Sequence, residues 1–225
     1  MTATTTLTTR AVLLDMDGTL VNSDAAVERC WRRWASEQGL DAEDVLPHVH
    51  GRQPHATMAL LLPDRPAERN LADNRRMLAQ ETTETDGIVP VRGAPALMAA
   101  LAGHPHALVT SSDEALALTR MSLTGLPLPA VRVTAEGVGA SKPDPEGFLK
   151  AAAELGHAPG DCVVFEDSEA GIAAGRAAGM RVVGVGPRAA ALDPDVHVTT
   201  LESVRVEALE GGGLRLHCAV PGARG

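Results

Sequence analysis

Aromatic side chains are almost absent from this sequence. Its 225 residues include no tyrosine, two tryptophans and two phenylalanines, which together make 2% of the chain. A hydrophobic core must therefore be built mainly from alanine, valine and leucine. No apolar run approaches the roughly 20 residues that a membrane helix needs, and the N-terminal sequence MTATTTLTTR lacks the basic and apolar regions of a signal peptide. We therefore expect no membrane partner.

Cysteine and lysine are also scarce. Cys30, Cys162 and Cys218 are widely spaced, form no CxxC pair and leave an odd thiol, so a reducing cytoplasm is the expected location. Lys142 and Lys150 are the only lysines among 20 basic residues, and arginine supplies the rest. The formal net charge of −9 argues against a nucleic-acid partner held by a basic surface.

What the sequence does contain is typical of a soluble globular chain. Apolar residues make 44% and charged residues 22%, and the length suits one large domain or a domain with an insertion. Short apolar runs alternate with helical stretches, which predicts an α/β fold with a Rossmann-like, doubly wound parallel sheet and right-handed crossovers. The expected strands cover residues 10–14, 107–110, 162–165 and 181–185, and the expected helices cover residues 94–102, 112–123, 145–155 and 170–178.

The segment after the first strand breaks this alternation. Val27, Trp31 and Trp34 recur at helical spacing after Ser23 or Asp24, either of which can cap a helix. Two further helices are expected there, and no strand is. We therefore predict a core domain interrupted by a small helical cap domain, with a hairpin near the C-terminus that turns at three glycines. The predicted boundaries are residues 1–21 and 91–225 for the core, 22–90 for the cap, 58–62 and 71–78 for the further helices, and 204–220 for the hairpin.

Two carboxylates follow the first expected strand. Asp15 and Asp17 stand two residues apart in the sequence Asp-Met-Asp-Gly-Thr, and the binding crevice of a doubly wound sheet lies at the carboxyl ends of its strands. One carboxylate there can act as a nucleophile while the other exchanges a proton with the leaving oxygen. The alternative is an acidic turn that caps the following helix.

Hydroxyl groups and a lysine follow in comparable positions. Thr110, Ser111 and Ser112 end the second core strand, where hydroxyls and turning N–H groups can hold phosphate oxygens. The alternative is a set of ordinary helix caps. Lys142 stands between a loop and the start of a helix, where a fixed cation can neutralise a nucleophile and a phosphate. The alternative for this residue is a solvated surface lysine.

A second acidic pair, Glu166 and Asp167, closes an apolar strand. Beside Asp15 and Asp17 these acids would be costly to bury unless a cation gathered them. Carboxylates, phosphate and water are ligands that suit Mg²⁺. The alternative is an ordinary acidic loop.

Together the four clusters resemble the four motifs of the haloacid dehalogenase superfamily, in the same order and over about 155 residues. The resemblance implies that Asp15 is the nucleophile that becomes an aspartyl phosphate and that Asp17 is the general acid/base. It also implies that Thr110 and the Ser111 backbone hold the phosphate, that Lys142 bridges phosphate and nucleophile, and that the helical insertion is a mobile cap. The implied Mg²⁺ ligands are Asp15, the Asp17 carbonyl, Asp167 and, through water, Glu166.

The superfamily includes several chemistries, and the residues favour a phosphatase. Asp17 argues against a dehalogenase, and the absence of lysine from residues 22–87 excludes a phosphonatase that forms a Schiff base in the cap. A phosphosugar mutase that resembles β-phosphoglucomutase is the main alternative, although Thr19 and Val27 depart from its pattern. A non-catalytic relative that only binds its ligand also stays open.

Several stretches resemble the sugar-phosphatase branch, which includes hexitol, glycerol-3-phosphate and 2-deoxyglucose-6-phosphate phosphatases; they are residues 50–52, 109–112, 133–136 and 164–172. The resemblance implies a small phosphorylated metabolite as substrate, and a monomer is the default expectation. Four cap residues are candidates for contacts with the sugar, and the alternative for each is a solvated helix surface: Glu28, Arg52, His55 and Glu84. A zinc site at His48, His50 and His55 is disfavoured by their irregular spacing and the absence of nearby thiols.

Overall fold

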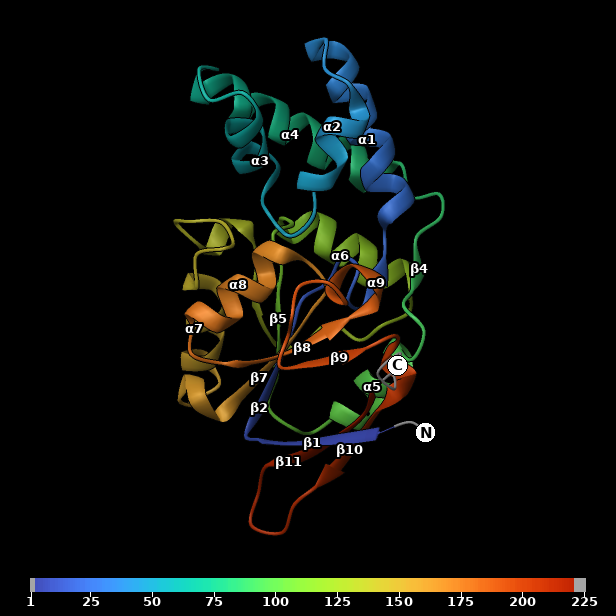
Figure 1. Cartoon of the computed structure of the whole chain (residues 1–225), viewed down its shortest axis with the longest axis vertical. Helices are drawn as coiled ribbons and strands as arrows, with labels where there is room; N and C mark the ends of the chain where they lie inside the picture. The colour runs from blue at the N-terminus through green and yellow to red at the C-terminus, as the bar shows by residue number, and fades with distance from the viewer. Residues whose placement is uncertain (1–2, 221–225) are drawn as a thin grey trace.

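A six-stranded parallel sheet forms the centre of the molecule in the computed structural model, which describes residues 3–220 (Figure 1). Its strand order is β6-β5-β2-β7-β8-β9, and every neighbouring pair is parallel. The chain starts at the centre, winds outward to β6, returns to β7 and winds outward again to β9. The predicted doubly wound α/β fold is therefore confirmed. The strands are β2 (Ala11–Leu14), β5 (His106–Val109), β6 (Val131–Val133), β7 (Cys162–Glu166), β8 (Arg181–Val185) and β9 (Val196–Val198).

The sequence pattern does not predict two of these strands, β6 and β9. Each has three residues, in which one polar side chain stands between two valines. Both lie at the edges of the sheet, where burial on both faces is incomplete. A continuous apolar run is the signal of a strand that is buried on both faces, so short edge strands do not give it.

Helices cover both faces of the sheet. Residues on alternate positions of β2 face opposite ways: Val12 and Leu14 join a core with α5 and α6, whereas Ala11 and Leu13 join a core with α7 and α8. The four longer helices begin and end within about two residues of their predicted boundaries, whereas α9 is not predicted. The helices are α5 (Ala94–Leu101), α6 (Glu114–Leu123), α7 (Glu146–Glu154), α8 (Glu169–Ala177) and the short α9 (Gly186–Ala189).

A three-stranded antiparallel sheet lies at the end of the core away from the inserted helices, in the order β1-β11-β10 (Figure 1). The predicted hairpin is present as β10 (Val204–Ala208) and β11 (Leu214–Val220). All three glycines of its turn have positive φ angles, which suits residues without a side chain. The third strand, β1 (Ala3–Thr9), is not predicted because its threonine-rich sequence has no apolar run, although threonine itself favours strands.

The insertion after the first motif is helical and has its own small core. Trp31 and Trp34 pack edge to face at its centre, with ring centroids 5.3 Å apart, and Trp34 Nε1 donates to Asp73. Two-residue strands β3 (Val21–Asn22) and β4 (Val89–Pro90) pair where the segment leaves and rejoins the core. Its helices lie above the carboxyl ends of the central strands in Figure 1; they are α1 (Asp24–Gln38), α2 (Ala42–Val45), α3 (Pro54–Leu61) and α4 (Ala67–Thr83). Across residues 3–220, none of the helices combines the length and the apolar character that crossing a membrane requires.

The small sheet should contribute strongly to stability. Leu216 is fully buried and belongs to the same core as the central strands. Leu216→Ala should lower the free energy of unfolding by about 2–5 kcal/mol, because the deletion leaves a cavity that the neighbours only partly fill. Leu123→Ala is the matched control, since that side chain is 51% exposed, and its effect should stay within about 0.5 kcal/mol. Chemical denaturation measures both, and an equal loss in the two variants would contradict this account of the core.

Candidate active site

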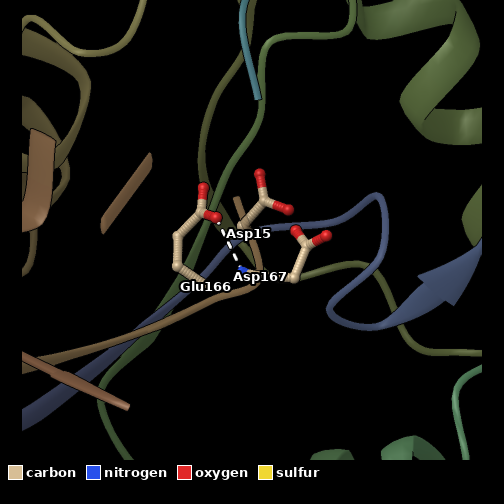
Figure 2. A group of neighbouring side chains, drawn as sticks. All are labelled: Asp15, Glu166 and Asp167. Atoms are coloured by element: carbon tan, nitrogen blue, oxygen red, sulfur yellow. Dashed lines mark hydrogen bonds between the residues drawn. The ribbon is translucent and has the colours of Figure 1, made fainter. Parts of the chain in front are cut away.

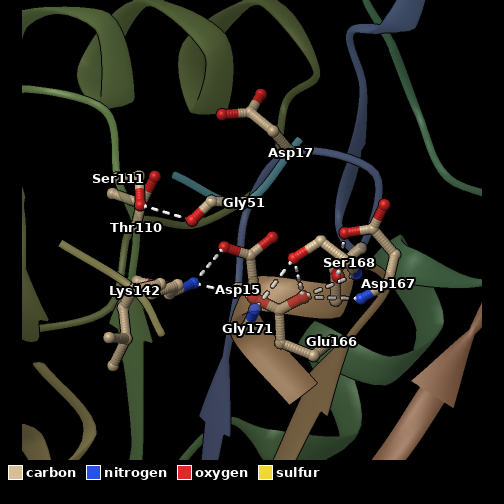
Figure 3. A network of polar contacts seen from close by, with 12 residues as sticks. Asp15, Asp17, Gly51, Thr110, Ser111, Lys142, Glu166, Asp167, Ser168 and Gly171 are labelled. Carbon is tan, nitrogen blue, oxygen red and sulfur yellow. Dashed lines mark hydrogen bonds and ion pairs between the residues drawn. The ribbon is translucent and has the colours of Figure 1, made fainter. Parts of the chain in front are cut away.

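The four motif clusters meet at the carboxyl ends of three central strands (Figure 3). Asp15 directly follows β2, Thr110 directly follows β5, and Glu166 is the last residue of β7. Lys142 reaches the same place from the loop before α7. Since β2 lies between β5 and β7, the winding of the sheet reverses here, and ligands of doubly wound folds bind at such a point.

Lys142 is a buried cation with three oxygen partners. Its Nζ donates to Asp15 Oδ1 at 2.7 Å, to Glu166 Oε1 at 2.8 Å and to the Val109 carbonyl at 3.1 Å. Burial alone would lower the pKa of Lys142, but the carboxylates of Asp15 and Glu166 raise it above its ordinary value. The lysine is therefore charged and has a fixed position beside Asp15, so the alternative of a solvated surface lysine does not hold.

Three carboxylates gather in the same place (Figure 2). One oxygen from each of Asp15, Glu166 and Asp167 lies within 4.8 Å of the others, and all three residues are buried. Burial, followed by the charge of Glu166, raises the pKa of Asp15 well above its ordinary value, and the same two causes raise the pKa of Asp167 to about 7. A cluster of this kind is costly unless a cation neutralises it, and its all-oxygen donor set suits a hard divalent cation.

The three carboxylates differ in what their oxygens already contact. Glu166 Oε2 accepts from the backbone N–H of Asp167 at 2.8 Å and of Ser168 at 2.9 Å, and from the Ser168 hydroxyl at 2.9 Å. With Oε1 taken by Lys142, Glu166 mainly positions the lysine and the loop before α8. Lys142 contacts Oδ1 of Asp15 and Arg188 contacts Oδ2 of Asp167, which leaves the other oxygen of each residue more open than those of Glu166. Asp15 and Asp167 are therefore better placed than Glu166 to hold a cation directly.

Two glycines make the close packing around these acids possible. A Cβ atom at Gly171, in the first turn of α8, would lie 1.7 Å from Glu166 Oε1. Gly18 has a φ angle of +86°, and a Cβ atom there would lie 2.2 Å from Asp167 Oδ2. Any side chain at either position would displace a carboxylate of the site.

Asp17 faces away from Asp167, into a neighbouring cavity (Figure 3). Its Oδ1 accepts from the Ser23 hydroxyl at 2.7 Å and lies 2.7 Å from Arg120 Nη1, and its Oδ2 accepts from the Ser112 hydroxyl at 3.0 Å. The Asp17 side chain is therefore held toward the helical insertion rather than toward the acidic cluster. Ser23 stands at the N-cap position of α1, but its hydroxyl bonds Asp17 rather than the helix.

A cavity of about 60 Å³ lies between the core and the inserted helices. Asp15 and residues 110–112 line one side of it, and the inserted helices supply most of the other side. Thr110 Oγ1 accepts from the Ser112 N–H at 3.1 Å, and the Ser111 hydroxyl donates to the Gly51 carbonyl of the insertion at 2.8 Å. The remaining lining residues are Asp17, Val27, Trp31, Val49, His50, Gly51, Arg52, Pro54, Leu78, Glu81, Leu116 and Arg120.

Only one of the four cap residues chosen from the sequence, Arg52, lines this cavity. Glu28 lies 3.8 Å from Arg32, and Glu84 lies 2.8 Å from Arg33; both contacts are exposed ion pairs outside the cavity lining. His55 is also outside the lining, and its backbone N–H donates to Asn74. The structure therefore does not bring Glu28, His55 or Glu84 to the site.

Three charged residues that the sequence does not predict to be functional also lie at the site. Arg120 contacts Asp17 and Glu81, and Arg188 Nη2 lies 2.6 Å from Asp167 Oδ2. A detectable signal existed for Arg120, because it falls on the buried face of α6 together with Leu116, Ala117 and Met121. A charged side chain on an apolar helix face has to be paired, and its partners are usually part of a site.

The histidines do not form a metal site. Within residues 3–220, the acidic cluster is the group whose side chains could jointly hold an ion. His50 Nε2 instead lies 3.4 Å from Arg188 Nη1. Burial and the charge of Arg188 lower the pKa of His50 to about 4, so this ring is neutral at neutral pH.

Comparisons with known proteins identify the family to which a site of this geometry belongs. The sequence model of the haloacid dehalogenase-like hydrolase family matches residues 9–179. The chain is similar to hexitol phosphatase A of Escherichia coli, with 40% identity over 210 residues that cover 90% of this chain and 96% of that protein. It is also similar to glycerol-1-phosphate phosphohydrolase 2 of Saccharomyces cerevisiae, with 31% identity over 191 residues that cover 80% of this chain and 75% of that protein.

Solved structures show the same fold. A β-phosphoglucomutase from Clostridium difficile superposes with a TM-score of 0.76 and covers 88% of this chain and 93% of its own. The two sequences are 20% identical, so this likeness concerns the architecture and not the reaction.

The metal-free protein should become more stable when Asp167 is replaced by asparagine. The pKa of Asp167 is about 7 in the fold against an ordinary value of 3.8. The folded state therefore binds more protons at Asp167 than the unfolded chain does between these values. The stability that this proton contributes is fully present below about pH 4 and is lost as pH rises toward 7. In chelator, the stability gain of Asp167→Asn should grow over this range and then level off.

Urea unfolding at pH 5 and pH 8 measures this difference. Asp44→Asn, at an exposed position of α2, is the control and should change stability little at either pH. A loss of stability in metal-free Asp167→Asn at pH 8 would show that the carboxylate is not destabilised by its surroundings.

Proposed function

Because this chain belongs to the haloacid dehalogenase-like hydrolase family, we propose that it is a metal-dependent phosphatase that hydrolyses small sugar or sugar-alcohol phosphates. One observation carries the proposal. Asp15 lies against the Lys142 cation on one side and the cavity on the other, while Asp17 faces the same cavity. A nucleophile, a fixed positive charge and a separate proton-transfer group therefore share one small space. The names of the related phosphatases support the substrate class.

The reaction proceeds in two displacements at phosphorus. In the first, an Asp15 carboxylate oxygen forms a bond to phosphorus, the ester P–O bond breaks, and Asp17 gives its proton to the leaving alcohol. In the second, Asp17 takes a proton from a water molecule, whose oxygen attacks the phosphorus of the aspartyl phosphate. The Asp15–phosphorus bond then breaks, which releases inorganic phosphate and restores both carboxyl groups.

Positive charge and N–H donors make the first step possible. A carboxylate and a phosphate dianion repel each other, and Lys142 offsets that repulsion at a distance of 2.7 Å from Asp15. Thr110 and the Ser111 backbone hold the phosphate oxygens at the end of β5, and Ser112 acts by orienting Asp17. These groups are fixed before substrate binds, so little reorganisation is needed during the reaction.

A divalent cation completes the charge balance. Asp15, Asp167 and the Asp17 carbonyl are the groups that would hold Mg²⁺, with Glu166 behind them. When bound, the ion neutralises the phosphate and the acidic cluster together. The raised pKa values of Asp15 and Asp167 support this assignment, because burial and the charge of Glu166 destabilise both carboxylates and a bound cation would offset this.

The inserted helices act as a cap domain over this site. We assign residues 22–90 to the cap and residues 1–21 and 91–225 to the core. A cavity of about 60 Å³ is small beside the roughly 300–1,000 Å³ of ligand clefts in general, so substrate reaches it when the cap opens. Closure excludes water from the aspartyl phosphate until the alcohol has left.

A mutase reaction is less well supported. The likeness to β-phosphoglucomutase rests on a fold shared at 20% identity. Val27, which stands where that family carries a cap histidine, lines the cavity with an apolar side chain that cannot transfer a proton. A protein that only binds its ligand would not require Asp15, Lys142 and Asp167 in mutual proximity.

Asp15→Asn should abolish phosphate release from p-nitrophenyl phosphate and from hexose, hexitol and glycerol phosphates. The amide is a poor nucleophile, so kcat should fall by more than about a thousandfold, while the fold is retained by circular dichroism. Asp44→Asn is the control with an unrelated exposed carboxylate and should keep wild-type activity. Unchanged activity in Asp15→Asn would refute the nucleophile, and conversion of β-glucose-1-phosphate to glucose-6-phosphate without release would favour the mutase.

Mg²⁺ should be required by the wild-type enzyme and bound through Asp167. Chelator should stop phosphate release, and added Mg²⁺ should restore it and raise Tm, because the ion binds the folded state alone. In Asp167→Asn the same concentration of Mg²⁺ should leave Tm nearly unchanged. Full activity in chelator, or an equal rise in Tm for the variant, would contradict the metal assignment.

A further inference from the structure

A buried ion pair joins the cap to the core beside the general acid/base. Arg120 on α6 contacts Glu81 on α4, and both are nearly inaccessible, with exposures of 2% and 5%. The same guanidinium lies 2.7 Å from Asp17 Oδ1 and donates to the Ser112 hydroxyl at 3.5 Å. One arginine therefore fixes a cap carboxylate and the Asp17 carboxylate relative to each other.

One carboxylate oxygen of Glu81 is available to a ligand. Its Oε2 is bonded to Arg120, whereas its Oε1 has no hydrogen-bond partner among residues 3–220. Oε1 is therefore not completely buried, and Glu81 lines the cavity. A carboxylate oxygen in this position can accept a hydrogen bond from a molecule in the cavity.

The position of Asp17 defines which part of a substrate Glu81 meets. A general acid must reach the leaving oxygen within hydrogen-bond distance, so the groups around Asp17 contact the first atoms of the leaving alcohol. The insertion also lines the cavity with apolar side chains, which include Val27, Trp31 and Leu78. Glu81 is the acidic residue that the insertion contributes to this lining, and it shares the Arg120 guanidinium with Asp17.

We propose that Glu81 is a specificity-determining residue that accepts a hydrogen bond from a hydroxyl of the leaving group, on the carbon next to the ester carbon, and that Arg120 is the positioning residue that holds Glu81 and Asp17 for this contact. The inference rests on the proposed phosphatase function and narrows it. The preferred substrates are phosphomonoesters of alcohols with vicinal hydroxyls. Alkyl and aryl phosphates of similar size leave the Glu81 oxygen without a partner, and an unmet polar group in a closed site penalises them.

Glycerol 1-phosphate and propyl phosphate form a matched pair for the test, because they differ only in two hydroxyls. The wild-type enzyme should have the higher kcat/KM for glycerol 1-phosphate. In Glu81→Gln the ratio of the two kcat/KM values should shrink by at least about tenfold, because the charged acceptor becomes a neutral amide and its hydrogen bond is weaker. The control is Glu84→Gln, three residues along the chain in an exposed ion pair, which should keep the wild-type ratio.

A second variant separates positioning from mere support of the fold. Lysine at position 120 keeps the charge but lacks the fork that spans Asp17 and Glu81. Arg120→Lys should therefore lower kcat for both substrates with KM for propyl phosphate nearly unchanged, and it should also shrink the ratio. Arg132→Lys, an exposed arginine paired with Glu114, is the control for the exchange itself.

Three outcomes would overturn the inference. The first is a wild-type enzyme that shows no preference for glycerol 1-phosphate while it still hydrolyses p-nitrophenyl phosphate through Asp15; the proposed function then stands and the role of Glu81 falls. The second is a folded Glu81→Gln variant that loses activity equally on both substrates or keeps its ratio. The third is a wild-type enzyme that hydrolyses none of these compounds, in which case the proposed function and this inference fall together.

Discussion

The contact between Lys142 and the carboxylates of Asp15 and Glu166 is the constraint on which the site depends. Three buried acids within 4.8 Å of one another would repel each other and destabilise the fold. Lys142 and Arg188 supply positive charge from two sides, yet the pKa of Asp167 still stands at about 7. Burial and the charge of Glu166 thus outweigh the effect of Arg188 on Asp167. A bound cation would stabilise these carboxylates, whereas a bound phosphate would add negative charge beside them.

The cap and the core are joined by polar contacts rather than by a shared apolar core. The helices of the insertion pack around their own tryptophans, whereas the contacts to the core include Ser111 with Gly51 and Arg120 with Glu81. The Gln53 backbone N–H also donates to the Ser141 hydroxyl at 2.8 Å. In the opening that we propose for the cap, water can replace each of these bonds.

The central fold and the residues that meet in the site follow from local patterns in the sequence. Apolar runs that end in acidic or hydroxyl groups predict parallel strands, and parallel strands bring Asp15, Thr110 and Glu166 to one edge. The residues of the insertion that line the cavity cannot be predicted from such local patterns. Glu81 lies in the last turn of α4 and Glu84 is the residue that follows this helix, yet the first contacts Arg120 and the second contacts Arg33. That choice depends on how α4 packs against α6 and α1, which no short stretch of sequence encodes.

The pairing of β3 with β4 has a consequence for how the two parts of the chain can change independently. Val21 lies opposite Pro90, and Asn22 lies opposite Val89, so the insertion leaves and rejoins the core at adjacent points. The insertion is therefore equivalent to a loop whose two ends are held together by the β3–β4 pair. The free-energy cost of closing a loop increases only slightly as the loop becomes longer. Helices can therefore be added to, removed from or exchanged within this segment while the sheet keeps its register. Such a fold can acquire a new preference among leaving groups without rebuilding the machinery that breaks the phosphate ester.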